Sequence, residues 1–288
     1  MPHGGAPRAT CRYDAMMRPD PLIVARLRAA GCVFAEDEAV LLGAAVDGRA
    51  DAADELERLV ARRVAGEPLE QVLGWAEFAG LRILLEPGVF VPRRRTELVA
   101  AEAVRLARAV QGRRAVVVDL CCGAGAIGAA VATAVEAAGG ALELVAADID
   151  PAAVRAARRN LEPLGATVVQ GDLYAPLPAG LRGRVDVLAV NAPYVPTDEI
   201  AMMPPEARDH EALVALDGGA DGLDVHRRIA ASAAEWLAPG GHLLIETSER
   251  QAPFAVETFT HSGLGARLAV SEDRDAHVVI GTRPAALG

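Results

Sequence analysis

The chain has 288 residues, of which 52% are hydrophobic and only 3% aromatic, and its formal net charge is −10 at pH 7. This length fits one large and one small unit with aliphatic cores, and the acidic total disfavours a broad nucleic-acid surface, which needs positive charge. No stretch has the ~20 apolar residues of a membrane span, and the start has no signal-peptide pattern, so we expect a cytoplasmic protein without membrane contact.

The four cysteines are Cys11, Cys32, Cys121 and Cys122. None forms a Cys-x-x-Cys pair, and a disulfide between the adjacent two would be strained, so reduced thiols are expected. The six histidines are scattered along the chain. Their spacing gives no metal-ligand pattern, and no metal site is predicted.

Three segments of different composition make up residues 1–92. Residues 1–19 contain Gly, Pro and Arg and are expected to form a flexible tail. Residues 20–72 combine good helix formers with helical spacing of apolar side chains, which predicts a bundle of three or more helices. In residues 73–92, glycines punctuate short apolar stretches, which predicts a hairpin connector.

Residues 93–288 alternate apolar strands with helices. The first helix is expected from Thr96 to about Val110, with the Thr96 hydroxyl able to cap it. Two late apolar runs around a polar turn predict an antiparallel hairpin that closes the sheet. This order predicts an α/β fold, with a doubly wound, mostly parallel, Rossmann-like sheet of seven strands that binds ligands outside their carboxyl ends. The expected strands are 115–121, 142–147, 168–169, 185–190, 241–246, 267–270 and 276–280, and the other expected helices are 127–138, 151–161 and 222–237.

A glycine-rich turn after the first of these strands is suited to a nucleoside cofactor. Gly123 and Gly125 let the backbone turn sharply and approach a ligand closely. Asp148, at the end of the second strand, is well placed to accept both ribose hydroxyls, and Asp172 after the third strand is expected to flank the adenine. The predicted cofactor residues are Asp119, Cys121, Cys122, Gly123, Ala124, Gly125, Asp148, Asp172, Leu173 and Asn191.

Two cofactors compete for this turn. A dinucleotide needs three glycines and places its pyrophosphate on the helix N-terminus. S-adenosylmethionine has no phosphate but carries an ammonium and a sulfonium. Asp119 beside the turn suits a cation better than a phosphate, so the residues favour S-adenosylmethionine.

The residues after the fourth strand, Asn191, Ala192, Pro193 and Tyr194, are suited to holding a planar amide or amine. The Asn191 carboxamide oxygen is able to accept one N–H of the substrate, and a nearby main-chain carbonyl accepts the second. The Tyr194 ring then packs on the flat face. With a reactive methyl group next to them, these four residues are the predicted catalytic residues.

Several motifs between about Arg62 and Arg283 resemble those of the HemK/PrmC family, the S-adenosylmethionine-dependent methyltransferases of release-factor glutamine. The most specific is Gly-Gly-x-Asp-Gly-Leu at 218–223. The resemblance implies a methyltransferase domain over 93–288 and a helical N-terminal unit that holds the protein partner. The other motifs are 66–74, 77–78, 91–93, 96–97, 119–125, 148–151, 171–173, 191–194 and 239–241.

The same resemblance implies methyl transfer to the side-chain amide nitrogen (N5) of a protein glutamine. The acceptor would be the Gly-Gly-Gln motif of a class-1 peptide chain release factor, and we expect the enzyme to be a monomer. Cys121 to Gly125 would hold the cofactor, Asp148 its ribose and Asp172-Leu173 its adenine, while Asn191 to Tyr194 would hold the substrate amide.

Three departures from the family pattern mark this chain as a divergent branch. Ala192 replaces the first Pro of Asn-Pro-Pro-Tyr, which keeps the main-chain carbonyl but loses rigidity. Cys121 replaces the first Gly of the turn, which is tolerable only if the residue has a negative φ. Arg94 and Arg95 stand where the family usually has Pro-Glu and add positive charge.

Two alternatives stay open at this point. The same chemistry fits a nucleic-acid amine or a small-molecule amide as acceptor, although the acidic total disfavours nucleic acid. A paralogue that binds S-adenosylmethionine without catalysis is also consistent with the substitutions at Cys121 and Ala192.

Overall fold

The computed structural model describes residues 19–285, which fall into two compact units, one ending at Leu73 and the other beginning at Gly74. Nearly all of the expected tail, residues 1–19, therefore lies outside the described residues. The division of the rest into 20–72, 73–92 and 93–288 stays a prediction. Within the described residues, no helix has the length and apolar character needed to cross a membrane.

The first unit is a small helical bundle. Asp20 caps its first helix by accepting the Leu22 N–H at 2.8 Å, and Pro21 occupies the first helical position, where no N–H is needed. Its aliphatic core includes the fully buried Leu27, Leu42 and Val60. The helices are α1 (Pro21–Ala29), α2 (Ala35–Val46), α3 (Ala52–Val64) and α4 (Leu69–Leu73).

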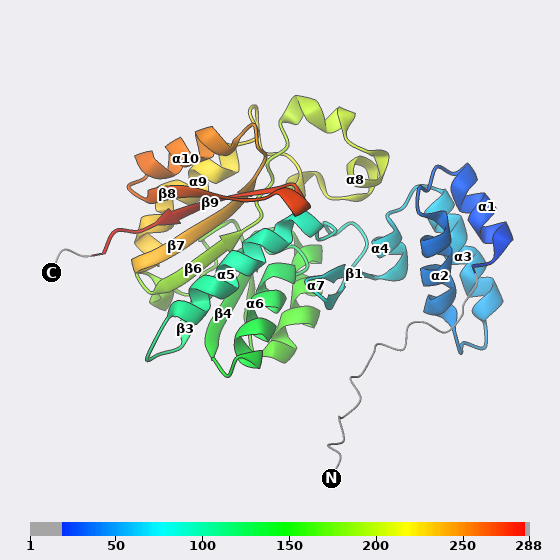
Figure 1. Ribbon diagram of the computed structural model, residues 1–288, viewed down its shortest axis with the longest axis horizontal. Helices are drawn as coiled ribbons and strands as arrows, with labels where there is room; N and C mark the ends of the chain where they lie inside the picture. Colours follow the sequence, from blue (N-terminus) through cyan, green and yellow to red (C-terminus); the bar gives the residue numbers. More distant parts are fainter. Residues whose placement is uncertain (1–18, 286–288) are drawn as a thin grey trace, which may run out of the picture. The chain divides into compact units, whose positions relative to one another are not determined.

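The second unit is built on a seven-stranded sheet with the order β5-β4-β3-β6-β7-β9-β8 (Figure 1). The first five strands in this order run parallel, and β9 is antiparallel to both β7 and β8. This confirms the predicted fold class and the antiparallel hairpin that closes the sheet. The strands are β3 (Ala115–Leu120), β4 (Leu142–Asp148), β5 (Thr167–Gln170), β6 (Val185–Val190), β7 (Leu237–Thr247), β8 (Gly265–Ser271) and β9 (Ala276–Thr282).

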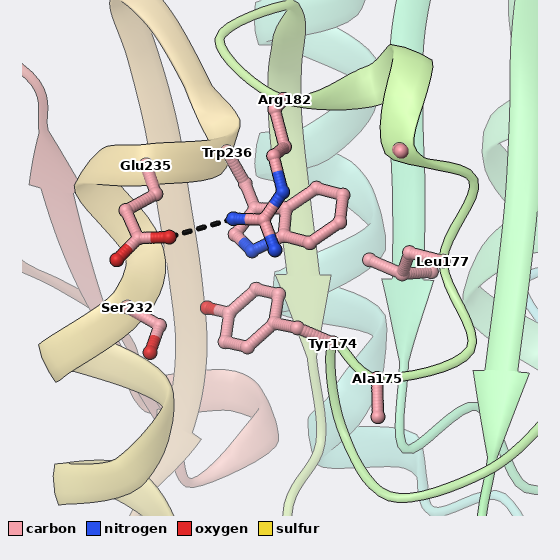
Figure 2. Close-up of a pocket in the computed structure, with 8 residues that line it drawn as sticks. Tyr174, Ala175, Leu177, Arg182, Ser232, Glu235 and Trp236 are labelled. Atoms are coloured by element: carbon pink, nitrogen blue, oxygen red, sulfur yellow. Dashed lines mark hydrogen bonds and ion pairs between the residues drawn. The ribbon is translucent and has the colours of Figure 1, made fainter.

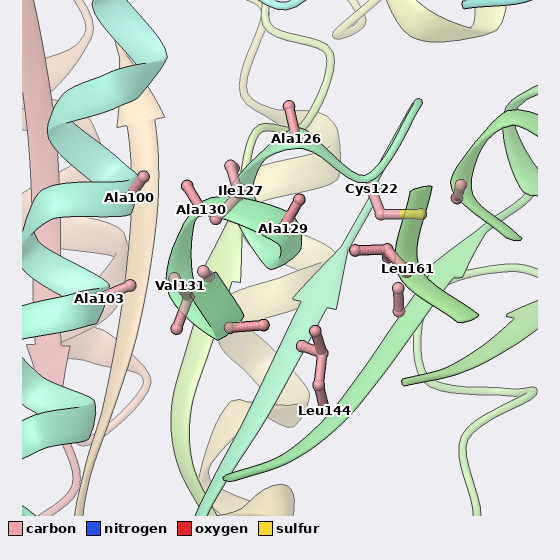
Figure 3. Close-up of a cluster of buried hydrophobic side chains, with 14 of the residues drawn as sticks. Ala100, Ala103, Cys122, Ala126, Ile127, Ala129, Ala130, Val131, Leu144 and Leu161 are labelled. Carbon is pink, nitrogen blue, oxygen red and sulfur yellow. The ribbon is translucent and has the colours of Figure 1, made fainter. Parts of the chain in front are cut away.

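Helices cover both faces of this sheet, as Figure 1 shows. On one face the alanine-rich α6 (Ala126–Ala137) lies close to β3 and β4, where Ala129, Val131 and Leu144 share a core with Leu161 (Figure 3). Small side chains allow this close approach. One face carries α5 (Glu97–Ala109), α6 (Ala126–Ala137) and α7 (Pro151–Leu161), and the other carries α9 (Asp224–Trp236) and α10 (Ala252–His261).

A short antiparallel hairpin, β1 (Trp75–Phe78) and β2 (Leu81–Leu84), precedes the sheet. The Asn160 side chain of α7 accepts the Leu84 N–H and donates to the Leu84 carbonyl, each at 2.9 Å. The same amide donates to the Ala124 carbonyl at 2.8 Å. One side chain thus connects the hairpin with the glycine-rich turn.

Three local expectations were wrong. Thr96 makes no side-chain capping bond at the start of α5. Strand β7 already begins at Leu237, so Pro239-Gly240-Gly241 lies within the strand and not in a turn before it. The pattern also gave no helix at α10 or at α8 (Pro205–His210), which both begin at or next to a proline.

Candidate active site

The register of the parallel strands brings the predicted site residues to one edge of the sheet. Leu120 of β3 pairs with Ala147 of β4 and with Val190 of β6. The next residues, Cys121, Asp148 and Asn191, therefore follow at the same level on three neighbouring strands. This is the carboxyl edge, where open α/β sheets bind their ligands.

The glycine-rich turn between β3 and α6 has three residues with positive φ. Gly123 has φ 54° and Gly125 has φ 81°, as expected for glycine. Cys121 has φ 56°, so the condition of a negative φ, under which a replacement of Gly is free of strain, is not met. A non-glycine residue in this region carries a strain of about 1–2 kcal/mol. At Gly125 a side chain is also excluded by packing, because an added Cβ would lie 2.7 Å from Leu161 Cδ1.

Asp119 is fully buried at the base of this turn. Its Oδ2 accepts the Gly128 N–H at 2.8 Å, which holds the start of α6. Its Oδ1 is buried and has no hydrogen-bond partner among the described residues. Burial raises the pKa of Asp119 to about 8, an effect that the charge of Asp148 strengthens. A buried acceptor of this kind fits a cationic ligand group.

Asp148 holds the turn from the neighbouring strand. Its Oδ2 accepts the Gly123 N–H at 2.8 Å, and its Oδ1 accepts the Asp150 N–H at 2.9 Å. Burial raises its pKa, while these two N–H groups favour the charged form. The predicted ribose acceptor therefore lies in contact with the predicted cofactor turn.

Asp172 and Leu173 follow β5, the strand that pairs with β4 at one side of the sheet. The Asp172 carboxylate pairs with the guanidinium of Arg228 on α9 at 2.6 Å. Leu173 has φ 47°, which marks a constrained bend at this position. The two residues lie at the same edge of the sheet, but the Asp172 carboxylate is engaged by a side chain of this protein.

The predicted substrate-holding residues begin directly after β6. Asn191 Nδ2 donates to the Thr96 hydroxyl at 3.2 Å, and the Tyr194 hydroxyl donates to Glu246 Oε1 at 3.0 Å. Burial raises the pKa of Tyr194, so its hydroxyl keeps the proton that it donates. Ala192 is 1% exposed and packs in the core between β6 and α9.

The sequence analysis did not identify Glu246 or the role of Thr96. Glu246 stands near the end of β7, one residue beyond the pair Val190–Ile245, and is therefore a strand neighbour of Asn191. Its side chain is 1% exposed. The signal from which the sequence analysis could have found it is a charged residue at the end of the apolar run Leu243-Leu244-Ile245.

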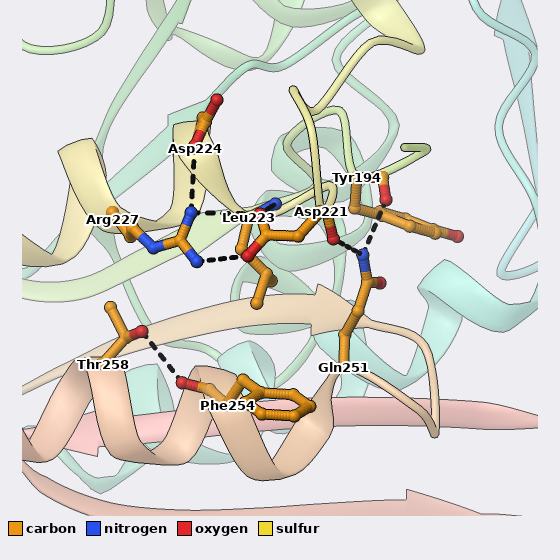
Figure 4. A network of polar contacts seen from close by, with 8 residues as sticks. All are labelled: Tyr194, Asp221, Leu223, Asp224, Arg227, Gln251, Phe254 and Thr258. Carbon is orange, nitrogen blue, oxygen red and sulfur yellow. Dashed lines mark hydrogen bonds and ion pairs between the residues drawn. The ribbon is translucent and has the colours of Figure 1, made fainter. Parts of the chain in front are cut away.

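The Gly-Gly-x-Asp-Gly-Leu motif packs directly on the backbone of Tyr194. A Cβ at Gly218 would lie 2.7 Å from Tyr194 Cα, and one at Gly222 would lie 2.2 Å from the Tyr194 carbonyl oxygen. Gln251 Nε2 donates to the Tyr194 carbonyl at 2.9 Å and to the Asp221 carbonyl at 3.0 Å (Figure 4). The motif and Gln251 thus fix the position of the Tyr194 backbone, three residues after Asn191, and we call this arrangement a clamp.

A surface hollow of about 290 Å³ lies elsewhere, between the loop after β5 and the end of α9 (Figure 2). The Tyr174 and Trp236 rings stack with centroids 5.6 Å apart, and Arg182 lies over Trp236. Arg182 also pairs with Glu235 at 2.6 Å. These side chains thus form stacking contacts and an ion pair with one another, and none of the predicted site residues lines the hollow.

Known proteins with similar sequences are methyltransferases. The model of the methyltransferase small domain matches residues 80–203. A release factor glutamine methyltransferase of Geobacter sulfurreducens is 39% identical over 207 residues, which cover 71% of this chain and 69% of the relative. One from Streptomyces coelicolor is also 39% identical, with 67% of each chain covered.

Two further similarities concern other acceptors. A 4-amino-L-phenylalanine/4-methylamino-L-phenylalanine methyltransferase of Streptomyces pristinaespiralis is 38% identical and covers 71% of this chain and 69% of its own. An rRNA methyltransferase of T. thermophilus, solved with AdoMet and guanosine, has a TM-score of 0.50 at 22% identity. It covers 73% of this chain and 49% of its own, and shows the same fold. The chain belongs to the release factor glutamine methyltransferase family and is an S-adenosylmethionine-dependent methyltransferase.

Proposed function

We propose that this enzyme methylates the side-chain amide nitrogen of glutamine in the Gly-Gly-Gln segment of a peptide chain release factor. The observation that carries the proposal is the row of strand ends in which Asn191 directly follows the strand beside the cofactor turn. The names of the relatives point to the same acceptor. The enzyme would act as a monomer in the cytoplasm, where release factors work.

The buried acidic side chains around the turn fit a cationic cofactor, because a positive charge beside them favours the ionised form that burial disfavours. Asp119 offers a buried oxygen without a partner among the described residues, and nothing lies within 4 Å of a Cβ added at Gly123, so a ligand is able to approach the backbone there. Asp148 would accept the ribose hydroxyls. When bound, S-adenosylmethionine supplies a methyl group on a positively charged sulfur, which keeps the electron pair of the broken bond.

The chain's own residues would orient a poor nucleophile. An amide nitrogen is weakly nucleophilic because its lone pair is delocalised, so alignment matters more than basicity. Asn191 Oδ1 and the Ala192 carbonyl would each accept one amide N–H. They hold the nitrogen in line and favour the positive charge that grows on it. The proton becomes acidic once the methyl group is attached and leaves to solvent, so no strong base is needed.

Replacing Asn191 with Ala is the direct test. Methyl transfer from radiolabelled S-adenosylmethionine to a purified bacterial class-1 release factor should fall by at least ~100-fold, the range for loss of a preorganised polar group. Binding of S-adenosylmethionine, measured by calorimetry, should change by less than about threefold. Methylation of the release factor at the wild-type rate by this variant would refute the assigned role.

A small aromatic amine is the second candidate acceptor. The observation that favours it is the 38% identity to the enzyme of Streptomyces pristinaespiralis, which is as similar as the release factor enzymes. An aniline nitrogen is also planar and carries two N–H groups. Competition between release factor and 4-amino-L-phenylalanine for the label separates the two acceptors.

A further inference from the structure

Glu246 is a buried polar residue of the site to which the proposed reaction gives no role. Glu246 is 1% exposed, and burial raises its pKa. A carboxylate in such a place costs several kcal/mol unless its surroundings compensate. The backbone around it is fixed, because β9 pairs with it and the His226 ring nitrogen Nε2 binds its carbonyl at 3.0 Å.

The neighbours of Glu246 favour its charged form. The hydroxyls of Thr96 and Tyr194 and the positive charges of Arg95 and Arg93 lower its pKa and so offset part of the effect of burial. The Tyr194 hydroxyl donates to Oε1 at 3.0 Å. Oε2 is buried and has no hydrogen-bond partner among the described residues, so it is able to accept the proton of the Thr96 hydroxyl.

The direction of the Thr96 O–H bond in turn determines which group of the Asn191 carboxamide faces Thr96. The Thr96 hydroxyl has a single proton, and when that proton points to Glu246 the hydroxyl oxygen is left as an acceptor. Asn191 Nδ2 donates to this oxygen at 3.2 Å. The hydroxyl is available because Thr96, 3% exposed, does not cap the helix that it precedes. When the NH2 group of the Asn191 carboxamide donates to Thr96, the oxygen of the carboxamide faces away from Thr96.

We propose that Glu246 and Thr96 are positioning residues that set the direction of the hydrogen bonds at the acceptor site, so that Asn191 presents its oxygen and not its NH2 group. The inference rests on the proposed function, because only an N–H donor such as the substrate amide needs that oxygen. If the Asn191 carboxamide were flipped, its NH2 group would face the N–H groups of the substrate, and these hydrogen-bond donors would repel one another. The site therefore selects an acceptor with two N–H groups and rejects the carboxylate of glutamate.

Three substitutions test this inference by activity. Glu246→Gln introduces an NH2 group that is able to donate, and Thr96→Val removes the hydroxyl at nearly constant shape. Both should lower kcat on the release factor by at least tenfold, with binding of S-adenosylmethionine within about twofold of wild type. Thr96→Ser keeps the hydroxyl and should retain kcat within about threefold.

Thr247→Val is the matched control. Thr247 is the next residue of β7, 4% exposed, and its hydroxyl has no hydrogen-bond partner among the described residues. Its loss should leave kcat unchanged, because no bond is broken. A purely structural role would instead appear as equal losses in Thr96→Val and Thr247→Val, or as no rescue by Thr96→Ser, and either result overturns the inference.

A second measurement is independent of turnover. The side-chain NH2 resonances of Asn191, assigned by their absence in Asn191→Ala, should shift and exchange faster with solvent in Thr96→Val and Glu246→Gln but not in Thr247→Val. Unchanged resonances together with wild-type kcat in both variants would disprove the positioning role while leaving the proposed function intact. If wild-type enzyme transfers no methyl group to the release factor, the proposed function fails, and the resonances still decide the orientation of Asn191.

Discussion

At the scale of single residues, burial changes the pKa of carboxyl groups at this site, and Asp119 shows the effect clearly. Its pKa in the folded chain is about 8, because burial disfavours the charge. In the unfolded chain the pKa is near ~3.9. Between pH ~4 and 8 the folded protein therefore binds a proton that the unfolded protein has lost, and the contribution of Asp119 to the free energy of unfolding falls as pH rises.

Comparison with Asp119→Asn isolates this contribution. Asparagine keeps an oxygen for the Gly128 N–H and has no proton to lose in this range. In the ligand-free protein, urea unfolding at several pH values between 5 and 8.5 should show wild type losing stability relative to Asp119→Asn as pH increases. Parallel curves for the two proteins would mean that Asp119 titrates normally, and would contradict the effect assigned to burial.

How far the sequence predicts the site differs from residue to residue. Asp148 ends β4 and Asn191 follows β6, the two parallel strands on either side of β3, so local patterns were enough to place them at one edge. The contact of Asn191 with Thr96 joins residues 95 positions apart and depends on the exact packing of α5. No local pattern contains such information. For the same reason the positive φ of Cys121 was not foreseen, since a turn imposes it on whichever residue stands there.

At the scale of elements, the glycine motif acts as a clamp on the substrate-holding segment. Gly222 has φ 77°, and a Cβ there would lie 2.2 Å from the Tyr194 carbonyl oxygen and 2.3 Å from Gln251 Nε2. Gly222→Ala should displace Tyr194, cost roughly 2–4 kcal/mol of stability and lower kcat at least tenfold. Urea unfolding and release factor methylation measure the two effects.

Gly240→Ala is the control for this substitution. Gly240 also has φ 77°, but nothing lies within 4 Å of its added Cβ, so it reports backbone strain alone. It should cost only about 1–2 kcal/mol and leave kcat unchanged. If the two variants lose stability and activity equally, the clamp on Tyr194 has no separate effect.

The elements that were predicted well are those with strong local patterns. The helix 151–161 and the strand 185–190 were predicted at the bounds that the structure has. Helix α10 was missed because Pro253 at its start and the scattered polar residues gave no clear period. Its helical state depends on burial of Ala255 and Phe259 against the sheet, which is a tertiary effect.

For the whole molecule, each of the two units has its own hydrophobic core. The first unit's core comprises residues between Ile23 and Leu73, and the sheet unit's clusters begin at Ala76. In the first unit, Leu22, Val33 and Phe34 are 75%, 80% and 68% exposed. We propose that these exposed apolar side chains belong to a surface that holds the protein partner.

A chain shortened to begin at Gly74 tests that role. It retains both clusters of the sheet unit, so it should fold and bind S-adenosylmethionine within about threefold of the full chain. Methylation of the intact release factor should drop at least tenfold through a higher KM, because the binding energy of the first unit is lost. Methylation of a short Gly-Gly-Gln peptide, which is too small to need that unit, should be unchanged. Equal rates on the intact factor for both chains would show that the sheet unit alone recognises the partner, and that the helical unit has another role.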